Sequence, residues 1–556
     1  MLDLLLTHAR IHTLSADRPT ASRLGVVGGR IVGVDEELGG DPPAARTVHC
    51  GGAVVVPGFG DAHNHMLWFG RSQGELDLTT CTSPDEVYRR VHRASRDLAA
   101  DRWLIGHGFD HEVLGGALHH EDLDRASGGR RVWLKHRSGH EGVASTRVLR
   151  DAGILAEPGR TVPGGTVIRD PGDAPSGGLQ EAAMRLATDL IPPATRAELA
   201  AALARASAIY ASEGLTHVTE CGIGGGLVGR SPFEAGAYQE ALRSGGLTVR
   251  VTLMPAADTL RRLGDPVGER PEVALDLGLH SGFGNDHLKL GAVKMWLDGS
   301  MLGKSAAISE PGYDDGCGCG YLAADPEEMK TLLVDAHRSG WQIAAHAIGD
   351  RAVDLAVDTL ATAQRVHPRP DARHRIEHAG LVRPDQIRAM AEVGAVPVPQ
   401  PRFLHEFGDA MATAVGPDRV DWLYRHRSFL EAGMRVPGSS DRPVASGAPL
   451  LGIRSMVERL SAAGRAIGAD ERVDVATALR AYTVDAAWVD HEEQLRGRLT
   501  RGRLADFVVL DADPLAVASR DLDGIRVLAT FVGGRCVYAG DAAPVDPDVA
   551  PLTSVR

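Results

Sequence analysis

The chain has 556 residues, of which 43% are hydrophobic and 24% charged, as is typical of soluble globular proteins; disorder, collagen and coiled coil are excluded for most of its length. A net charge of −13 without a long basic cluster argues against nucleic-acid binding. Six cysteines are too few for a disulfide scaffold and are expected to be free, whereas 23 histidines are unusually many.

The N-terminus begins with a short apolar run, Leu4–Leu6, that polar residues soon interrupt. This interruption and Asp3 are unlike a signal peptide, which needs a basic start and a longer apolar core. No apolar run approaches the roughly 18 residues that span a membrane. We therefore expect a cytoplasmic protein without a membrane contact.

Both ends of the chain contain short apolar segments that are typical of β-strands. Near the N-terminus they are separated by Gly28-Gly29 and Gly39-Gly40, and near the C-terminus Gly533-Gly534 predicts a hairpin turn. These ends predict one small β domain built from residues 1–57 and 490–545. Two unrelated caps are the alternative.

The middle of the chain, residues 58–489, alternates short apolar segments with helical stretches such as 197–213, 326–339 and 352–366. Repeated β–α units predict an α/β fold with a parallel sheet, closed into a barrel or left open. The segments expected as strands are 131–135, 216–219, 247–253, 287–296, 342–346, 374–378, 395–398 and 435–438. Residues 75–215 are too long for one crossover and predict an insertion near the active site.

A histidine pair follows the apolar segment Val54–Val56. We expect this strand to run into a turn that presents His63 and His65. Residues i and i+2 of extended backbone point to the same side, so both imidazoles can reach one metal ion. Solvated loop histidines are the alternative.

Lys294 lies inside the otherwise apolar run Gly291–Leu297. A fully buried lysine is costly unless it is paired or chemically altered. Carbamylation by carbon dioxide would give N6-carboxylysine, an anionic ligand that can bridge two metal ions. Pairing with a nearby carboxylate such as Asp298 is the alternative.

Three further predicted strands end at His346, at His378 and close to Asp441. Each of these residues alone is more often a polar loop residue. Together with the earlier residues they place potential ligands at the C-terminal ends of successive strands, where barrel enzymes assemble their sites. The sequence therefore predicts a metal centre ligated by His63, His65, Lys294, His346, His378 and Asp441.

These motifs resemble the amidohydrolase superfamily, specifically family 3, the YtcJ-like branch that includes N-substituted formamide deformylases. The matching stretches cover nearly the whole chain: Pro57–His65, Lys294–Ser300, His346–Val353, Arg375–Ala379, Ser440–Val444 and Gly502–Leu510. The resemblance implies a (β/α)8 TIM-like barrel with a second, small β-sandwich domain. It also implies one or two divalent metal ions, commonly Zn2+, and a homodimer.

The chain departs from the family pattern in two places. The family usually carries Asp-Gly-His and then an Asn-Ser pair in its inserted region, where this chain has Ser138-Gly139-His140 followed by Glu141. The strand end with Asp441 reads Ser-Ser-Asp instead of Gly-Ser-Asp. The ligand set is unaffected, but transfer of a substrate from the family is weakened.

The predicted reaction is hydrolysis of a non-peptide carbon–nitrogen bond in a small-molecule amide, N-formyl compound, carbamate or cyclic amide. Binding to a metal ion lowers the pKa of water from about 15.7 to near 7, and the resulting hydroxide is expected to attack the carbonyl carbon. Asp441 is predicted to act as general base and then as general acid. His140 is predicted to stabilise the oxyanion or to orient the substrate, with a structural role as the alternative.

Two other functions remain open. A mononuclear deaminase could use the same histidines and aspartate without a carboxylated Lys294. A catalytically inert barrel could act as an interaction protein, but such a protein is expected to lose ligands that this chain keeps.

Three other features of the sequence give weaker indications of function. Cys317 and Cys319 lack a second pair of thiols and indicate a loop turn rather than a metal clip. The glycine-rich segment 222–229 lacks the Lys-Ser/Thr ending of a phosphate loop. Arg402 follows a predicted strand and either faces an anionic substrate or lies on the surface.

Overall fold

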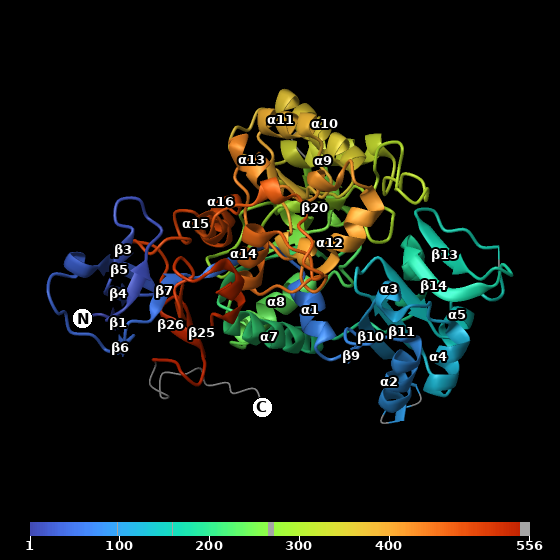
Figure 1. The fold of residues 1–556 in the computed structure, drawn as a ribbon, viewed down its shortest axis with the longest axis horizontal. Helices are drawn as coiled ribbons and strands as arrows, with labels where there is room; N and C mark the ends of the chain where they lie inside the picture. The colour runs from blue at the N-terminus through green and yellow to red at the C-terminus, as the bar shows by residue number, and fades with distance from the viewer. Residues whose placement is uncertain (97, 100, 158, 265–271, 545–556) are drawn as a thin grey trace.

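The structure is a computed structural model that describes residues 1–96, 98–99, 101–157, 159–264 and 272–544. Figure 1 shows a β-rich lobe that holds the N-terminus, a central α/β body, and a third lobe on the opposite side of that body. No helix in the described ranges combines the length and the apolar character needed to cross a membrane.

Eight parallel strand segments, which fill seven positions of the central body, lie in two hydrogen-bonded groups. The first group contains β8 (Phe59–Asn64), β15 (Leu215–Ile223), β16 (Arg250–Pro255) and β19 (Leu288–Leu290). The second contains β20 (Val293–Trp296), β21 (Ile343–Ala347), β22 (Arg375–His378) and β23 (Val396–Val398). β19 and β20 are two parts of the predicted strand 287–296, which pairs first with β16 and then with β21.

The two groups are joined at both sides. A parallel bridge links Ala256, which follows β16, to Lys294 on β20. On the other side the segment 436–441 occupies the eighth position, where the amide of Asp441 donates to the carbonyl of His63 at 2.8 Å. The hydroxyl of Ser439 donates to the carbonyl of Pro399 at 2.9 Å. The arrangement is the predicted (β/α)8 barrel.

Two details of the predicted strands were wrong. The segment 435–438 is not a regular strand, and Pro437 in it has no N–H to donate to a neighbour. The stretch after Val56 does not turn, because β7 (Val54–Pro57) is followed at once by β8. His63 therefore lies within a barrel strand, and His65 directly precedes helix α1 (Met66–Ser72).

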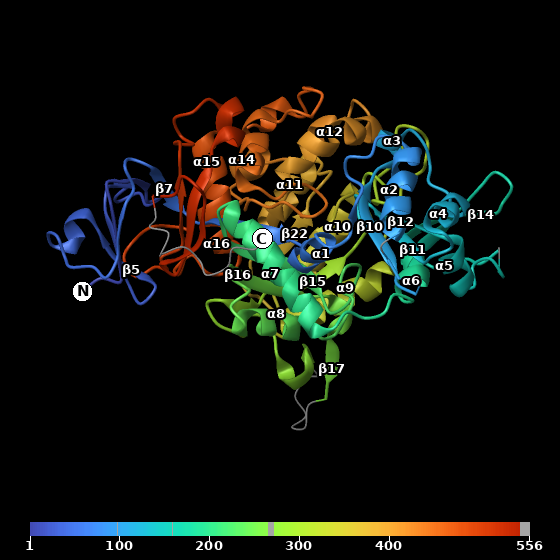
Figure 2. The ribbon, with the colours of Figure 1, turned by 90° about the horizontal axis from the view of Figure 1, so that it is seen from below.

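The helices that cover the barrel strands are α7 (Arg196–Ser212), α8 (Glu234–Arg243), α9 (Pro326–Arg338), α10 (Asp350–Val366), α11 (Pro384–Glu392), α12 (Pro401–Val415), α13 (Arg427–Glu431), α14 (Pro449–Glu458), α15 (Val475–Arg480) and α16 (Ala486–Val489). Of these, α7, α9 and α10 match the predicted helical stretches. α7 starts with a capping box between Thr195 and Glu198, which satisfies amides that have no partner in the helix. α7 and α8 run along the same side of the body (Figure 2).

Strands from both ends of the chain form the β-sandwich, which confirms that part of the predicted fold. One sheet contains β1 (Leu4–Thr7), β4 (Leu24–Val27), β5 (Arg30–Val34) and β6 (Thr47–His49). The other contains β2 (Arg10–His12), β3 (Thr20–Ala21), β7, β24 (Phe507–Leu510), β25 (Val527–Val532) and β26 (Arg535–Ala539). Their facing side chains share one core that includes Leu6, Ile31 and Phe507. The domain limits at residues 57 and 490 stay a prediction.

The third lobe lies within the predicted insertion. Its sheet contains β9 (Leu76–Asp77), β10 (Leu104–Phe109), β11 (Val132–His136), β12 (Glu141–Ala144), β13 (Gly165–Arg169) and β14 (Pro175–Glu181). Its helices are α2 (Pro84–Arg96), α3 (His111–Leu114), α4 (His120–Ser127), α5 (Thr146–Asp151) and α6 (Arg185–Thr188). A separate hairpin of β17 (Arg261–Leu263) and β18 (Glu272–Ala274) projects from the barrel (Figure 2).

Candidate metal centre

The C-terminal ends of the barrel strands bring the predicted ligands together. Nε2 of His63 lies 3.3 Å from Nζ of Lys294 and 3.3 Å from Oδ1 of Asp441. Nε2 of His65 lies 3.0 Å from the same Oδ1 atom. These side chains are at most 9% exposed.

The two remaining predicted ligands complete the cluster. The ring centroids of His346 and His378 are 4.4 Å apart, and those of His378 and His63 are 4.8 Å apart. Ligand atoms of His63, His378 and Asp441 lie within 4.8 Å of one another. The structure thus gathers all six predicted ligands, while their roles toward a metal stay a prediction.

Three histidines of this cluster direct one ring nitrogen away from the centre, toward a hydrogen-bond partner. Nδ1 of His63 lies 2.5 Å from a carboxylate oxygen of Glu377, and Nδ1 of His378 lies 2.6 Å from the amide oxygen of Gln400. Nε2 of His346 lies 3.1 Å from the carbonyl oxygen of Gly299. Such contacts fix the tautomer and leave the other nitrogen as a lone-pair donor, as in metal sites whose histidines are oriented from behind.

Glu377 is the buried anion of the centre. Arg375 donates from Nε to its Oε1 atom at 2.6 Å. Burial alone would raise the pKa of Glu377, but Arg375 and His63 outweigh it and lower the pKa from 4.5 to about 2. Glu377 is therefore ionised at neutral pH.

Lys294 has no exposed surface and no carboxylate oxygen within ion-pair distance among the described residues. The alternative pairing with Asp298 is not formed. Asp298 instead accepts the amides of Ile348 (3.0 Å), Gly349 (2.8 Å) and Ala307 (3.0 Å). The amine of Lys294 faces His63 and the ring of Trp296, 5.0 Å from its centroid.

A divalent ion fits this set of residues. Among the described residues Oδ1 of Asp441, which faces the cluster, is buried without a hydrogen bond, an arrangement that costs free energy unless a further partner binds. His378 and Asp441 adopt the left-handed backbone region with φ of 69° and 59°, a strain that clusters at functional sites. Imidazoles with a carboxylate are ligands that suit zinc.

The backbone that carries Asp441 is held by the end of β8. Asp61 accepts the hydroxyl of Ser440 at 2.5 Å and its amide at 3.0 Å. Burial would raise the pKa of Asp441, but the close imidazoles of His63 and His65 outweigh it and hold the pKa well below the usual range. Asp441 is therefore available as a base at neutral pH.

The insertion contributes His140 to the wall of this centre. Its ring centroid lies 6.2 Å from that of His346, and it lines the cavity that also contains Lys294 and Asp441. Nδ1 of His140 contacts Glu181 at 3.0 Å, and Ser305 donates to Glu181 at 2.7 Å. Burial lowers the pKa of His140, but Glu181 outweighs it and leaves the pKa raised.

Sequence reasoning missed the residues that orient the ligands. Glu377 stands within the matching stretch Arg375–Ala379, where a carboxylate next to a ligand histidine was the available signal, and Gln400 follows the predicted strand 395–398. Glu181 lies in a strand of the insertion that was not predicted. Arg402 pairs with Glu406 at 3.0 Å on its own helix instead of facing the centre. Cys317 is a free, exposed thiol.

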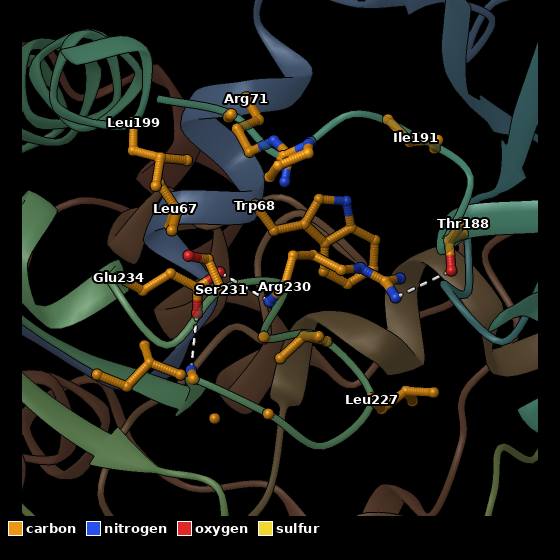
Figure 3. A pocket seen from close by; sticks show the side chains of 18 of the residues that line it. Leu67, Trp68, Arg71, Thr188, Ile191, Leu199, Leu227, Arg230, Ser231 and Glu234 are labelled. Carbon is orange, nitrogen blue, oxygen red and sulfur yellow. Dashed lines mark hydrogen bonds between the residues drawn. The ribbon is translucent and has the colours of Figure 1, made fainter. Parts of the chain in front are cut away.

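A larger pocket of about 450 Å3 adjoins the metal centre (Figure 3). Trp68 of α1 lines this pocket and also the cavity that holds His65 and Lys294. Gly139 and the loop residues Leu227 and Val228 line both as well. The glycine-rich segment 222–229 thus contributes to the wall of both cavities.

Three comparisons connect this geometry with known proteins. The sequence model described as "Amidohydrolase family" matches residues 46–538. YtcJ of Bacillus subtilis (strain 168) is 29% identical over 507 residues, which cover 89% of this chain and 91% of that protein. An N-substituted formamide deformylase of Arthrobacter pascens is 29% identical over 558 residues, which cover 97% and 98%.

A solved structure shares the fold over nearly the whole length. It is described as an uncharacterized metal-dependent hydrolase from Pyrococcus horikoshii, with a TM-score of 0.73 and 25% identity. The similarity covers 93% of this chain and 99% of that one.

Proposed function

The chain belongs to the amidohydrolase family, as its motifs indicated, and from this premise we propose that it is a metal-dependent hydrolase of non-peptide carbon–nitrogen bonds. The observation that carries the proposal is the convergence of the six predicted ligands on one buried point. The deformylase named above acts on a formamide, so N-formyl and related amides are the first substrates to examine.

The residues that would hold the metal are His63, His65, Lys294, His346, His378 and Asp441. A divalent ion such as Zn2+, one or two per chain, supplies Lewis acidity that lowers the pKa of water and polarises a carbonyl. We propose N6-carboxylysine at Lys294, because a buried amine without an acidic partner is available to react with carbon dioxide and gains a favourable charge beside a cation.

Asp441 would act as base and acid in turn. Its carboxylate is ionised at neutral pH and lies between His63 and His65, so it can accept a proton from the attacking water. The same carboxyl then delivers the proton to the leaving nitrogen. His140 donates Nδ1–H to Glu181, and the raised pKa of the ring favours the imidazolium, whose Nε2–H would donate to the carbonyl oxygen as negative charge develops there.

The test combines metal quantification with hydrolysis of N-formyl, N-acyl, carbamate and cyclic imide compounds by the zinc- or manganese-replete protein. We expect turnover of at least one class that is lost in Asp441→Asn. Metal-loaded protein without activity on the whole panel would instead favour an interaction protein.

A substitution of Lys294 distinguishes the proposed hydrolase from the mononuclear deaminase. A Lys294→Ala variant that keeps full activity with one tightly bound ion would favour a mononuclear deaminase. The homodimer and the cytoplasmic location expected from the sequence stay predictions.

A further inference from the structure

The pocket beside the metal centre has room for a small molecule. Its volume of about 450 Å3 lies within the common range for ligand sites. Trp68 separates it from the centre, with its ring centroid 5.7 Å from that of His65. A Cβ atom on Gly139 would lie 2.3 Å from the Trp68 ring, so the glycine permits this close approach. The pocket and the cavity of the metal centre thus adjoin at Trp68 and Gly139, which line both.

Most carboxylates in the pocket wall already have partners. Glu75 lies 2.6 Å from Nζ of Lys135. Glu234 accepts the backbone amides of Gly224 at 2.7 Å and Arg230 at 2.8 Å.

Glu220, a buried carboxylate of the wall, also has partners. It accepts the amide of Leu67 at 2.9 Å and the hydroxyl of Tyr238. Asp189 is exposed, and neither Arg71 nor Arg230 comes within ion-pair distance of it. The negative charges of the wall are thus largely bound by protein groups.

Three arginines line the wall, and in the described ranges Arg185, which is exposed, lacks a carboxylate partner, as do Arg71 and Arg230. In the described ranges neither Arg71 nor Arg230 forms an ion pair with a carboxylate. Within the part of the chain that the structure describes, the only side-chain hydrogen bond of Arg230 goes to the hydroxyl of Thr188 at 3.3 Å. Figure 3 shows both side chains reaching into the pocket beside Trp68, Arg71 from α1 and Arg230 from the position directly after the glycine-rich segment.

We propose that this pocket binds a carboxylate of the substrate through Arg71 and Arg230, with the apolar part of the substrate against Trp68. This inference rests on the proposed function, since it places the scissile amide at the metal centre. Guanidinium groups present planar donors that match a carboxylate, and two unpaired cations at one wall favour an anion. The substrate class is then an N-acyl compound that carries a carboxylate away from the bond that breaks.

Matched substrates test the proposal. Release of formate is measured for an N-formyl amino acid with a free carboxylate and for its methyl ester, in wild type, Arg71→Met, Arg230→Met and the double variant. Arg388→Met is the control, because this exposed arginine of α11 lies away from the pocket. We expect kcat/KM of wild type to favour the free acid by about tenfold or more, since hydrogen bonds to charged groups contribute about that much.

The ratio of acid to ester is the readout. It should fall toward one in the arginine variants, stay at the wild-type value in Arg388→Met, and recover in part in Arg71→Lys and Arg230→Lys. A ratio near one in wild type, or a wild-type ratio in the double variant, would overturn the proposal. Thermal unfolding verifies that each variant is folded.

Failure of the proposed function gives a different result. If wild type releases formate from neither compound, calorimetric titration with the same N-formyl amino acid decides on the pocket alone. Binding to wild type that is lost in the double variant supports the carboxylate site. Absence of binding to wild type, or equal binding to both proteins, contradicts it.

Discussion

An oxygen of the Glu377 carboxylate lies 2.5 Å from Nδ1 of His63, inside the barrel and with no exposed surface on either side chain. Arg375 holds the other oxygen at 2.6 Å, so the carboxylate cannot rotate away. The contact fixes the ring of His63 with Nε2 toward Lys294 and Asp441. The geometry of the candidate metal centre therefore depends on a residue that is not itself a predicted ligand.

Glu377→Gln should weaken metal binding. The amide keeps the shape of the side chain but removes the charge that makes His63 a stronger ligand, and loss of such a partner typically costs about 10–100-fold in affinity. Competition with a chromogenic chelator measures the change. The control is Glu392→Gln, an exposed position at the end of α11. Equal zinc affinity in both variants would contradict the orienting role.

Glu377 should also make the metal-free protein sensitive to acid. Its pKa is about 2 in the folded protein against 4.5 in the unfolded chain, so its stabilisation is present above pH 4.5 and is lost as the pH falls toward 2. Urea unfolding midpoints of chelator-treated wild type should drop more steeply below pH 4.5 than those of Glu377→Gln. Parallel curves would show that the carboxylate contributes no such linkage.

The sequence predicted the barrel and the ligand cluster better than the surroundings of the site. His63 and His346 stand near the ends of apolar strands and Lys294 lies inside one, and both kinds of position are local signals. The contacts of His140 with Glu181 depend on how the sheet of the insertion folds back on the barrel, which no local pattern encodes. Whether Arg71 forms an ion pair is equally non-local, because it depends on which carboxylates the fold brings close to it.

Lys294→Ala should lower activity strongly and reduce the metal content. The variant removes the amine that we propose to be carboxylated, and the histidines would remain without a bridging anion. Metal analysis and kinetics are measured on the same preparation, with short carboxylates added to replace the missing group. Partial rescue by formate or acetate supports the bridging role. Undiminished activity with one ion per chain would favour the mononuclear alternative.

A buried ion pair joins the barrel to the β-sandwich. Nε of Arg250 on β16 donates to Oδ2 of Asp506 at 2.7 Å, and Nη2 donates to Oδ1 at 2.9 Å. Asp506→Asn leaves the arginine buried without its charge partner and should cost about 3–5 kcal/mol of stability. Replacing both residues by apolar ones, Arg250→Met with Asp506→Leu, should recover much of it. Urea unfolding measures both, and an unchanged midpoint in Asp506→Asn would refute the link.

The metal content of the purified chain tests the central claim most directly. Zinc is counted per chain after repletion and removal of loosely bound ions, in wild type, Asp441→Asn and the exposed control Asp418→Asn. We predict at least about one ion per chain in wild type and control, and a clear loss in Asp441→Asn. Wild-type protein that retains less than about half an ion per chain would contradict the metal centre.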